Sequence, residues 1–112
     1  MKSYLYNLLR EPLASHIESL DDAEATHIHR DIILRKPVLY KIYCDKYTEF
    51  KNFLEQNQQN GVILEIGSGS GLSKLFLPEI LSSEITFFPW IDAVFNATEL
   101  PFSNDSISCI FV

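Results

Sequence analysis

The chain has 112 residues, of which 46% are hydrophobic and 21% charged, with 9 basic and 15 acidic side chains. This length suits one domain, and a net charge of -6 excludes a general binder of the nucleic-acid backbone, which needs a basic face. No apolar run reaches the roughly 18 to 20 residues of a membrane helix, and the first residues have no signal-peptide pattern. We therefore expect a cytoplasmic protein that binds neither nucleic acid nor membrane.

The thiol and imidazole side chains form no recognisable reactive motif. Cys44 and Cys109 lie far apart and belong to no C-x-x-C pair, so we expect reduced structural thiols, with a disulfide as the alternative. His27 and His29 are two residues apart and would point to different sides of a helix. The sequence therefore predicts no metal site.

Residues 1–60 are expected to form an N-terminal helical cap. Asp21 and Glu24 have the spacing of a capping pair, and the apolar residues after them predict a helix that Pro37 ends. A second helix is expected to run on to the Asn-Gly pair at 60–61, because apolar side chains recur in it at intervals of three and four residues. This apolar stripe comprises Leu39, Ile42, Tyr43, Tyr47, Phe50, Phe53 and Leu54.

Residues 61–112 have the pattern of an α/β sheet. Val62–Ile66 is a short, continuously apolar run, which predicts a strand buried on both faces. A glycine-rich loop follows it, and a short helix is expected over 72–77. Strand, loop, helix and strand in this order are typical of a sheet with parallel strands. Further strands are expected over 85–88, 93–95 and 107–112.

The glycine-rich loop, residues 67–71 (Gly-Ser-Gly-Ser-Gly), follows the first strand at the place where open α/β sheets bind ligands. Glycines let a ligand approach the backbone closely, which favours a small-molecule cradle over a plain turn. A phosphate-binding P-loop is excluded because Leu72, and not lysine, follows Gly71. A hydrolase elbow is excluded because Gly69 stands where the nucleophilic serine belongs, and Leu72 also breaks the dinucleotide fingerprint G-x-G-x-x-G.

Two segments resemble a known family. Residues 63–71 (Ile-Leu-Glu-Ile-Gly-Ser-Gly-Ser-Gly) look like the first motif of class I S-adenosylmethionine-dependent methyltransferases. Residues 96–102 (Asn-Ala-Thr-Glu-Leu-Pro-Phe) are similar to the D-A-x-x-L-P-F segment of the small-molecule branch of that family, and residues 103–107 match the lead into its fourth strand. The resemblance implies a Rossmann-like fold, S-adenosyl-L-methionine as the cofactor, and methyl transfer to a small-molecule acceptor.

The resemblance also implies a set of cofactor-binding residues. The three loop glycines would pass under the methionine part and the ribose, and Glu65 would fix the loop and the cofactor's amino group. Glu84, at the end of the second strand, would accept the ribose hydroxyls, with Asp92 as its rival. Asn96 stands where the family often has an aspartate for the adenine amino group, and its carbonyl oxygen can still accept a hydrogen bond. The implied residues are Glu65, Gly67, Ser68, Gly69, Gly71, Glu84 and Asn96.

Aromatic side chains outside the loop are expected to pack rather than to react. Tyr43 and Tyr47 share the apolar face of the long helix and are expected to pack in the core. The alternative is that one of them extends to the mouth of the cofactor site. Trp90 is expected to pack at the end of a strand, and Cys109 to be a small core residue. No residue is identified as a general base.

The chain stops at Val112, inside the expected fourth strand. In the resembled fold, elements after the fourth strand bind the methyl acceptor. We therefore expect this chain to be the N-terminal part of a methyltransferase, truncated after the fourth strand. Such a part should bind the cofactor better than it catalyses methyl transfer. Residues 85–95 leave no room for a full helix between the second and third strands. An open sheet edge favours a homo-oligomer or a partner that covers it. The alternatives are a non-catalytic cofactor-binding or interaction module and a fragment of a nicotinamide-dependent oxidoreductase.

Overall fold

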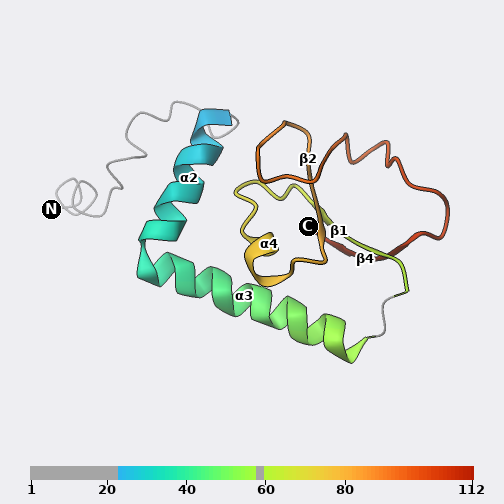
Figure 1. Cartoon of the computed structure of the whole chain (residues 1–112), viewed down its shortest axis with the longest axis horizontal. Helices are drawn as coiled ribbons and strands as arrows, with labels where there is room; N and C mark the ends of the chain where they lie inside the picture. The colour runs from blue at the N-terminus through green and yellow to red at the C-terminus, as the bar shows by residue number, and fades with distance from the viewer. Residues whose placement is uncertain (1–22, 58–59) are drawn as a thin grey trace, which may run out of the picture.

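The computed structural model describes residues 23–57 and 60–112, and Figure 1 shows two long helices ahead of an α/β part. The expected order of elements is confirmed, and the helix after the glycine loop is a single short turn. The capping pair at residues 21 and 24 lies partly outside the described residues. The elements in chain order are α2 (Ala23–Arg35), α3 (Pro37–Gln56), β1 (Val62–Ile66), α4 (Ser73–Phe76), β2 (Leu81–Glu84), β3 (Ala93–Val94) and β4 (Ile107–Phe111).

The four strands form one sheet in the order β3-β2-β1-β4, in which every neighbouring pair is parallel. β1 is central: it pairs with β2 through Leu64 and Leu81, and with β4 through Ile63 and Cys109. Leu64 has 0% of its surface exposed, which confirms the expected buried strand. Because all strands point the same way, their carboxyl ends share one edge of the sheet, and the glycine loop leaves β1 at that edge.

The second strand begins earlier than its hydropathy predicts. Residues 85–88 were expected to be extended in the sheet, but β2 covers Leu81–Glu84, and Ile85 and Phe87 are 65% and 71% exposed. The two serines of β2 are buried instead, and their hydroxyl groups hydrogen-bond to a carboxylate and to a backbone carbonyl. Buried hydroxyls with partners are stable, but a hydropathy pattern does not register them. As expected, residues 85–92 form no helix before β3.

The core joins the helices to the sheet. Phe50 of α3 stacks on Phe111 of β4, with the two ring centroids 4.2 Å apart. Cys109 packs against the same cluster, as expected, and both cysteines are free thiols. In Figure 1, α3 runs along one side of the sheet next to α4. The buried members of the core cluster are Ile33, Tyr47, Leu54, Leu72, Leu77 and Ile80.

The apolar stripe of α3 is narrower than its sequence predicts. Ile42 and Phe53 are 56% and 49% exposed, although the expected stripe includes both. The side chains that face the core lie at positions 43, 47, 50 and 54, which is one line at helical spacing. α3 also ends at Gln56, ahead of the Asn-Gly pair. Within the described ranges, neither long helix combines the length and the apolar composition that crossing a bilayer requires.

Candidate functional site

The glycine loop follows a path that ordinary residues avoid. Gly67, Gly69 and Gly71 have φ angles of 68°, 49° and 65°. A side chain at such angles costs about 1 to 2 kcal/mol, because its Cβ comes too close to the backbone. The loop therefore requires glycine at these positions for its own conformation.

The space around these glycines differs along the loop. A Cβ built on Gly67 would have no other atom within 4 Å, so the backbone there borders open space. A Cβ built on Gly71 would lie 2.1 Å from Cδ1 of Trp90, because the indole packs directly against the backbone. A ligand can thus approach the loop closely at Gly67, whereas the indole covers Gly71.

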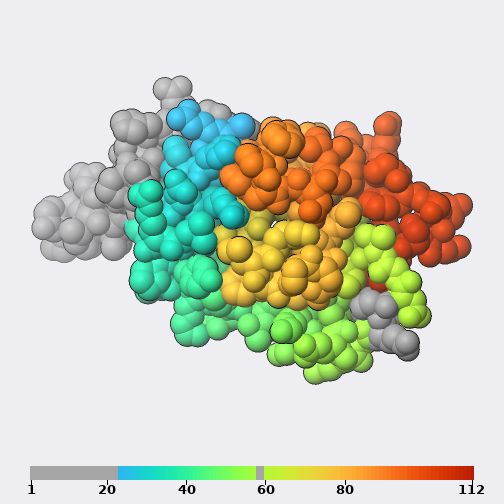
Figure 2. All heavy atoms as spheres, in the orientation of Figure 1, coloured from blue at the N-terminus to red at the C-terminus, as the bar shows by residue number. Residues whose placement is uncertain are grey.

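Helix α2 and the segment before β3 contact the glycine loop and donate hydrogen bonds to its backbone. Trp90 Nε1 donates a hydrogen bond of 2.8 Å to the carbonyl of Gly69, and Arg30 donates one to the carbonyl of Ser70. The Arg30 guanidinium also lies over the Trp90 ring, 4.7 Å from its centroid, and His27 meets the same ring edge to face. Figure 2 shows α2, in blue and cyan, against the orange segment that precedes β3. These contacts tie two carbonyl groups of the loop to α2 and to the segment before β3.

Glu65 places a buried carboxylate at the carboxyl end of β1. It is 8% exposed, and its Oε2 accepts a hydrogen bond from the hydroxyl of Ser73. The hydroxyl of Ser83 donates to its backbone carbonyl at 2.7 Å. Burial raises the pKa of Tyr47, and the negative charge of Glu65 raises it further. Among the described residues no donor is bonded to Oε1 of Glu65, so this oxygen remains available to a ligand.

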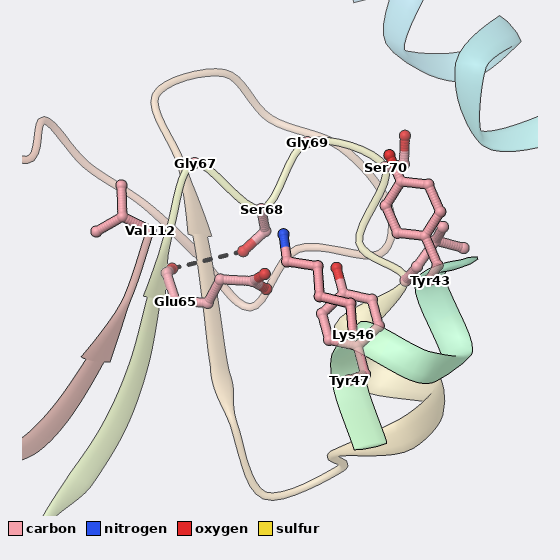
Figure 3. Close-up of a pocket in the computed structure, with 10 residues that line it drawn as sticks. Tyr43, Lys46, Tyr47, Glu65, Gly67, Ser68, Gly69, Ser70 and Val112 are labelled. Atoms are coloured by element: carbon pink, nitrogen blue, oxygen red, sulfur yellow. Dashed lines mark hydrogen bonds between the residues drawn. The ribbon is translucent and has the colours of Figure 1, made fainter. Parts of the chain in front are cut away.

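A cavity of about 270 Å³, the first cavity, lies between α3 and the glycine loop (Figure 3). Tyr43, Lys46 and Tyr47 form its helix wall, and Glu65 with the loop forms the opposite wall. Val112, just after β4, also borders the cavity. The cavity therefore sits beside the junction of β1 and β4, with one carboxylate and one ammonium group on facing walls.

A second cavity, of about 150 Å³, lies on the other side of Gly67 and is lined by Glu84 and Asn96 among others. Glu84 is the last residue of β2, which is the place that the family resemblance implies for it. Its Oε2 accepts the N–H of Gly69 at 3.1 Å, and its Oε1 accepts the N–H of Ile85 at 2.9 Å. Because Gly67 borders both cavities, an extended ligand can cross the loop there and reach Glu65 with one end and Glu84 with the other.

Asp92 and Asn96 differ in what they offer a ligand. Asp92 lines neither of the two cavities: its Oδ2 accepts the N–H of Ser82 at 2.9 Å and pairs with Lys74 at 2.8 Å. Burial opposes ionisation of Asp92, but the bonds from Lys74 and Ser82 outweigh it and lower its pKa. Asn96 lines the second cavity, but its Oδ1, which was expected to accept from the adenine amino group, already accepts two hydrogen bonds from Thr98.

All the residues implied by the resemblance except Gly71 line at least one of the two cavities, and Gly67 lines both. Sequence reasoning missed Lys46, which lies beside the apolar stripe of α3, and Arg30, which no motif marks. It treated Trp90 as packing, and the indole does pack, but on the loop itself. No group of three or more His, Cys, Asp or Glu side chains arranged for a metal ion occurs among the described residues.

Comparison of the chain with protein-family models, with curated proteins and with solved structures finds no match in any of the three. A functional assignment therefore rests on the sequence motifs and on the geometry of the two cavities.

Proposed function

We propose that this chain binds S-adenosyl-L-methionine at the glycine loop, as a class I methyltransferase-like α/β domain. The observation that carries the proposal is the pair of cavities on either side of Gly67, with Glu65 beside one and Glu84 beside the other. S-adenosyl-L-methionine is an elongated molecule with an amino-acid end and a nucleoside end, each of which offers hydrogen-bond donors to a carboxylate. The strand order β3-β2-β1-β4 supports the proposal, since it equals the first four strands of the doubly wound nucleotide-binding order.

The position of the first cavity gives further support. In doubly wound sheets, ligands bind outside the carboxyl ends of the strands, where the strand order reverses direction. Here the order reverses between β1 and β4, and the first cavity has Glu65 of β1 on one side and Val112 just after β4 on the other. The loop motif therefore coincides with the expected crevice of this sheet.

Each carboxylate suits one end of the cofactor. The half-buried Glu84 carboxylate lies at the end of β2, where ribose hydroxyls can donate to it, and its bonds to two backbone N–H groups hold it in place. Charge-assisted bonds of this kind are about twice as strong as neutral ones. Glu65 is available to the amino group through Oε1. The bonds of Asp92 to Ser82 and Lys74 give it a structural role instead.

Methyl transfer is the chemistry that this cofactor supplies: an acceptor oxygen, nitrogen or carbon attacks the sulfonium methyl carbon, and the C–S electron pair returns to sulfur. The part of this chain is to align and desolvate the cofactor, which is the main requirement of such a reaction. We propose a small-molecule acceptor, without assigning a general base among the residues of the chain.

Titration calorimetry of the full chain tests the proposal, with S-adenosylhomocysteine and S-adenosylmethionine as probes and NADH as the comparison. Trp90 is the single tryptophan, and because it contacts the loop, its fluorescence offers a second readout. We expect binding of both adenosyl compounds, no binding of NADH, and loss of binding in a folded Gly69→Val variant. Absence of binding of both adenosyl compounds to the wild type would refute the proposal, and binding of NADH alone would favour an oxidoreductase.

The open edge of the sheet supports a second candidate, a non-catalytic module completed by a partner or by another copy of the chain. β4 is an edge strand of the described sheet, and Ile110 on it is 45% exposed. Light scattering coupled to size exclusion separates the two candidates. A dimer that binds no adenosyl compound would favour the interaction module, and a monomer that binds one would favour the cofactor site.

A further inference from the structure

A third cavity, of about 280 Å³, lies between α2 and α3, which meet at an angle (Figure 1), and it reaches the glycine loop. Two isoleucines of α2 in its wall are nearly buried, with Ile32 8% and Ile33 7% exposed. Tyr43 and Ser70 line both this cavity and the first one, so the two cavities adjoin at these residues. The described lining consists of His29, Ile32, Ile33, Leu39, Tyr43 and Ser70.

This lining is apolar, with a few groups that can form hydrogen bonds. It includes no described lysine, arginine, aspartate or glutamate, so a charged ligand would lose its hydration there without meeting an opposite charge. His29 is partly buried, and neither its imidazole nor the hydroxyl of Tyr43 is hydrogen-bonded to another described residue. Both groups can bind a hydroxyl. The cavity therefore suits an uncharged apolar compound that carries a hydroxyl group.

The volume of the third cavity limits the size of this compound. Cavities that hold drug-sized ligands measure roughly 300 to 1,000 Å³, and this one, at about 280 Å³, is just below that range. A single substituted ring suits the space better than a fused-ring system or a peptide.

We propose that the third cavity binds the methyl acceptor, and that this acceptor is a small uncharged compound with an apolar body and a hydroxyl group, such as an alkylphenol. The inference rests on the proposed function and deepens it, because a compound in the third cavity lies beside a ligand in the first. It assigns acceptor recognition to the two helices ahead of the sheet, whereas the resemblance assigns it to elements after the fourth strand. His29 and Tyr43 are then the residues that select a hydroxyl group over a hydrocarbon.

Two probes of nearly equal shape test this site on the full chain. para-Ethylphenol has the hydroxyl group, and para-ethyltoluene has a methyl group in its place. Titrations followed by saturation-transfer NMR, with and without saturating S-adenosylhomocysteine, measure their affinities. We expect para-ethylphenol to bind about fivefold more tightly than para-ethyltoluene, the factor that one neutral hydrogen bond of about 1 kcal/mol provides.

A second NMR measurement tests whether the two ligands lie side by side. para-Ethylphenol should still bind when S-adenosylhomocysteine is present. Nuclear Overhauser effects should then join its protons to the methylene protons of the homocysteine part, because such effects arise only between protons that are close together.

A substitution that fills the cavity tests the location. Leu39→Phe adds bulk inside the third cavity, whereas Val38→Phe adds the same kind of bulk at a neighbour that is 74% exposed and lines neither this cavity nor the first. We expect Leu39→Phe to weaken para-ethylphenol binding at least about tenfold and to leave S-adenosylhomocysteine binding unchanged. Val38→Phe should change neither. His29→Leu should lower the preference for para-ethylphenol over para-ethyltoluene, and circular dichroism checks the folding of each variant.

Each failure has its own meaning. Absence of para-ethylphenol binding, equal affinity for the two probes, or full binding by a folded Leu39→Phe variant overturns the acceptor site while cofactor binding stands. Competition between para-ethylphenol and S-adenosylhomocysteine, or absence of the Overhauser effects between them, does the same. Failure of the wild type to bind S-adenosylhomocysteine or S-adenosylmethionine overturns the proposed function, and the assignment of an acceptor falls with it.

Discussion

Replacing Glu84 by glutamine should weaken the binding of S-adenosylhomocysteine at least about tenfold. The glutamine side chain keeps one oxygen, so one of the two bonds that the carboxylate accepts from the N–H groups of Gly69 and Ile85 is lost. The ligand loses charge-assisted bonds as well. A hydrogen bond to a charged group contributes about 1.5 to 3 kcal/mol, and the half-buried position argues for the lower value, which still exceeds one tenfold step of about 1.4 kcal/mol.

Asp92→Asn is the matched control, since it makes the same chemical change at an acid that lines neither cavity. We expect it to leave affinity unchanged and to lower the free energy of unfolding by about 1 kcal/mol or less, because the Asp92–Lys74 pair is part-exposed, with 35% and 29% of the two side chains accessible. Calorimetry at neutral pH measures affinity, and urea unfolding measures stability.

The pH dependence gives this control its own signature. The pKa of Asp92 is lower in the folded protein than its ordinary value of 3.8. The stability that its charge adds is therefore complete above pH 3.8 and is lost as the pH falls toward the folded value. Wild type and Asp92→Asn should converge in stability in that acid range. A damaging Asp92→Asn beside a silent Glu84→Gln would assign the wrong acid to the ligand, and two silent variants would refute ribose binding at β2.

Three further outcomes follow from the loop and the core. Gly71→Ala should lower the free energy of unfolding more than Gly67→Ala, because both residues have positive φ but only the alanine at 71 would meet the Trp90 indole; equal losses in urea unfolding would contradict this packing. Trp90→Phe should cost at least about 1 kcal/mol, since it loses the bond to the carbonyl of Gly69 and the indole atoms that pack against Gly71, and an unchanged melting temperature would show that these contacts add nothing. Burial raises the pKa of Tyr47 above 10.0, so Tyr47 ionises first in the unfolded state, and the stability of the protein falls as the pH rises beyond 10.0. Tyr47→Phe should remove this loss of stability at alkaline pH. Identical alkaline unfolding profiles of the wild type and Tyr47→Phe would argue against this role of Tyr47.

Segments with strong local signals were predictable from the sequence. The spacing of apolar residues indicates α3, and the apolar run Val62–Ile66 followed at once by glycines indicates a central strand with a loop at its carboxyl end. Such patterns are informative because apolar residues mark the buried faces of a helix or strand. One face of α3 is apolar, whereas both faces of β1 are. The family resemblance put Glu84 at the end of the second strand, where β2 does end, whereas the hydropathy pattern predicted that strand only after Glu84, over 85–88.

Burial of polar groups depended on the tertiary structure. The serines of β2 are buried because Asp92 and the carbonyl of Glu65 accept their hydroxyl hydrogens, and hydropathy predicted the strand at Ile85 and Phe87 instead. The width of the apolar stripe on α3 was likewise set by its packing partners, among them Phe76 of α4 and Phe111 of β4. A sequence pattern identifies apolar side chains, but partners elsewhere in the chain determine which polar ones become buried.

By itself, the sequence determined that this is an α/β chain with helices ahead of a parallel sheet, and that its glycine loop lies at the carboxyl edge of that sheet, just after Glu65. Only the tertiary structure decided what surrounds the loop. Arg30 and Trp90 donate hydrogen bonds to loop carbonyls that lie 40 and 21 residues away in the sequence. Lys46 faces Glu65 across the first cavity. The reason is physical. Neighbouring residues determine the local backbone conformation and which face of a helix or strand is apolar, whereas contacts between distant segments depend on how whole elements pack.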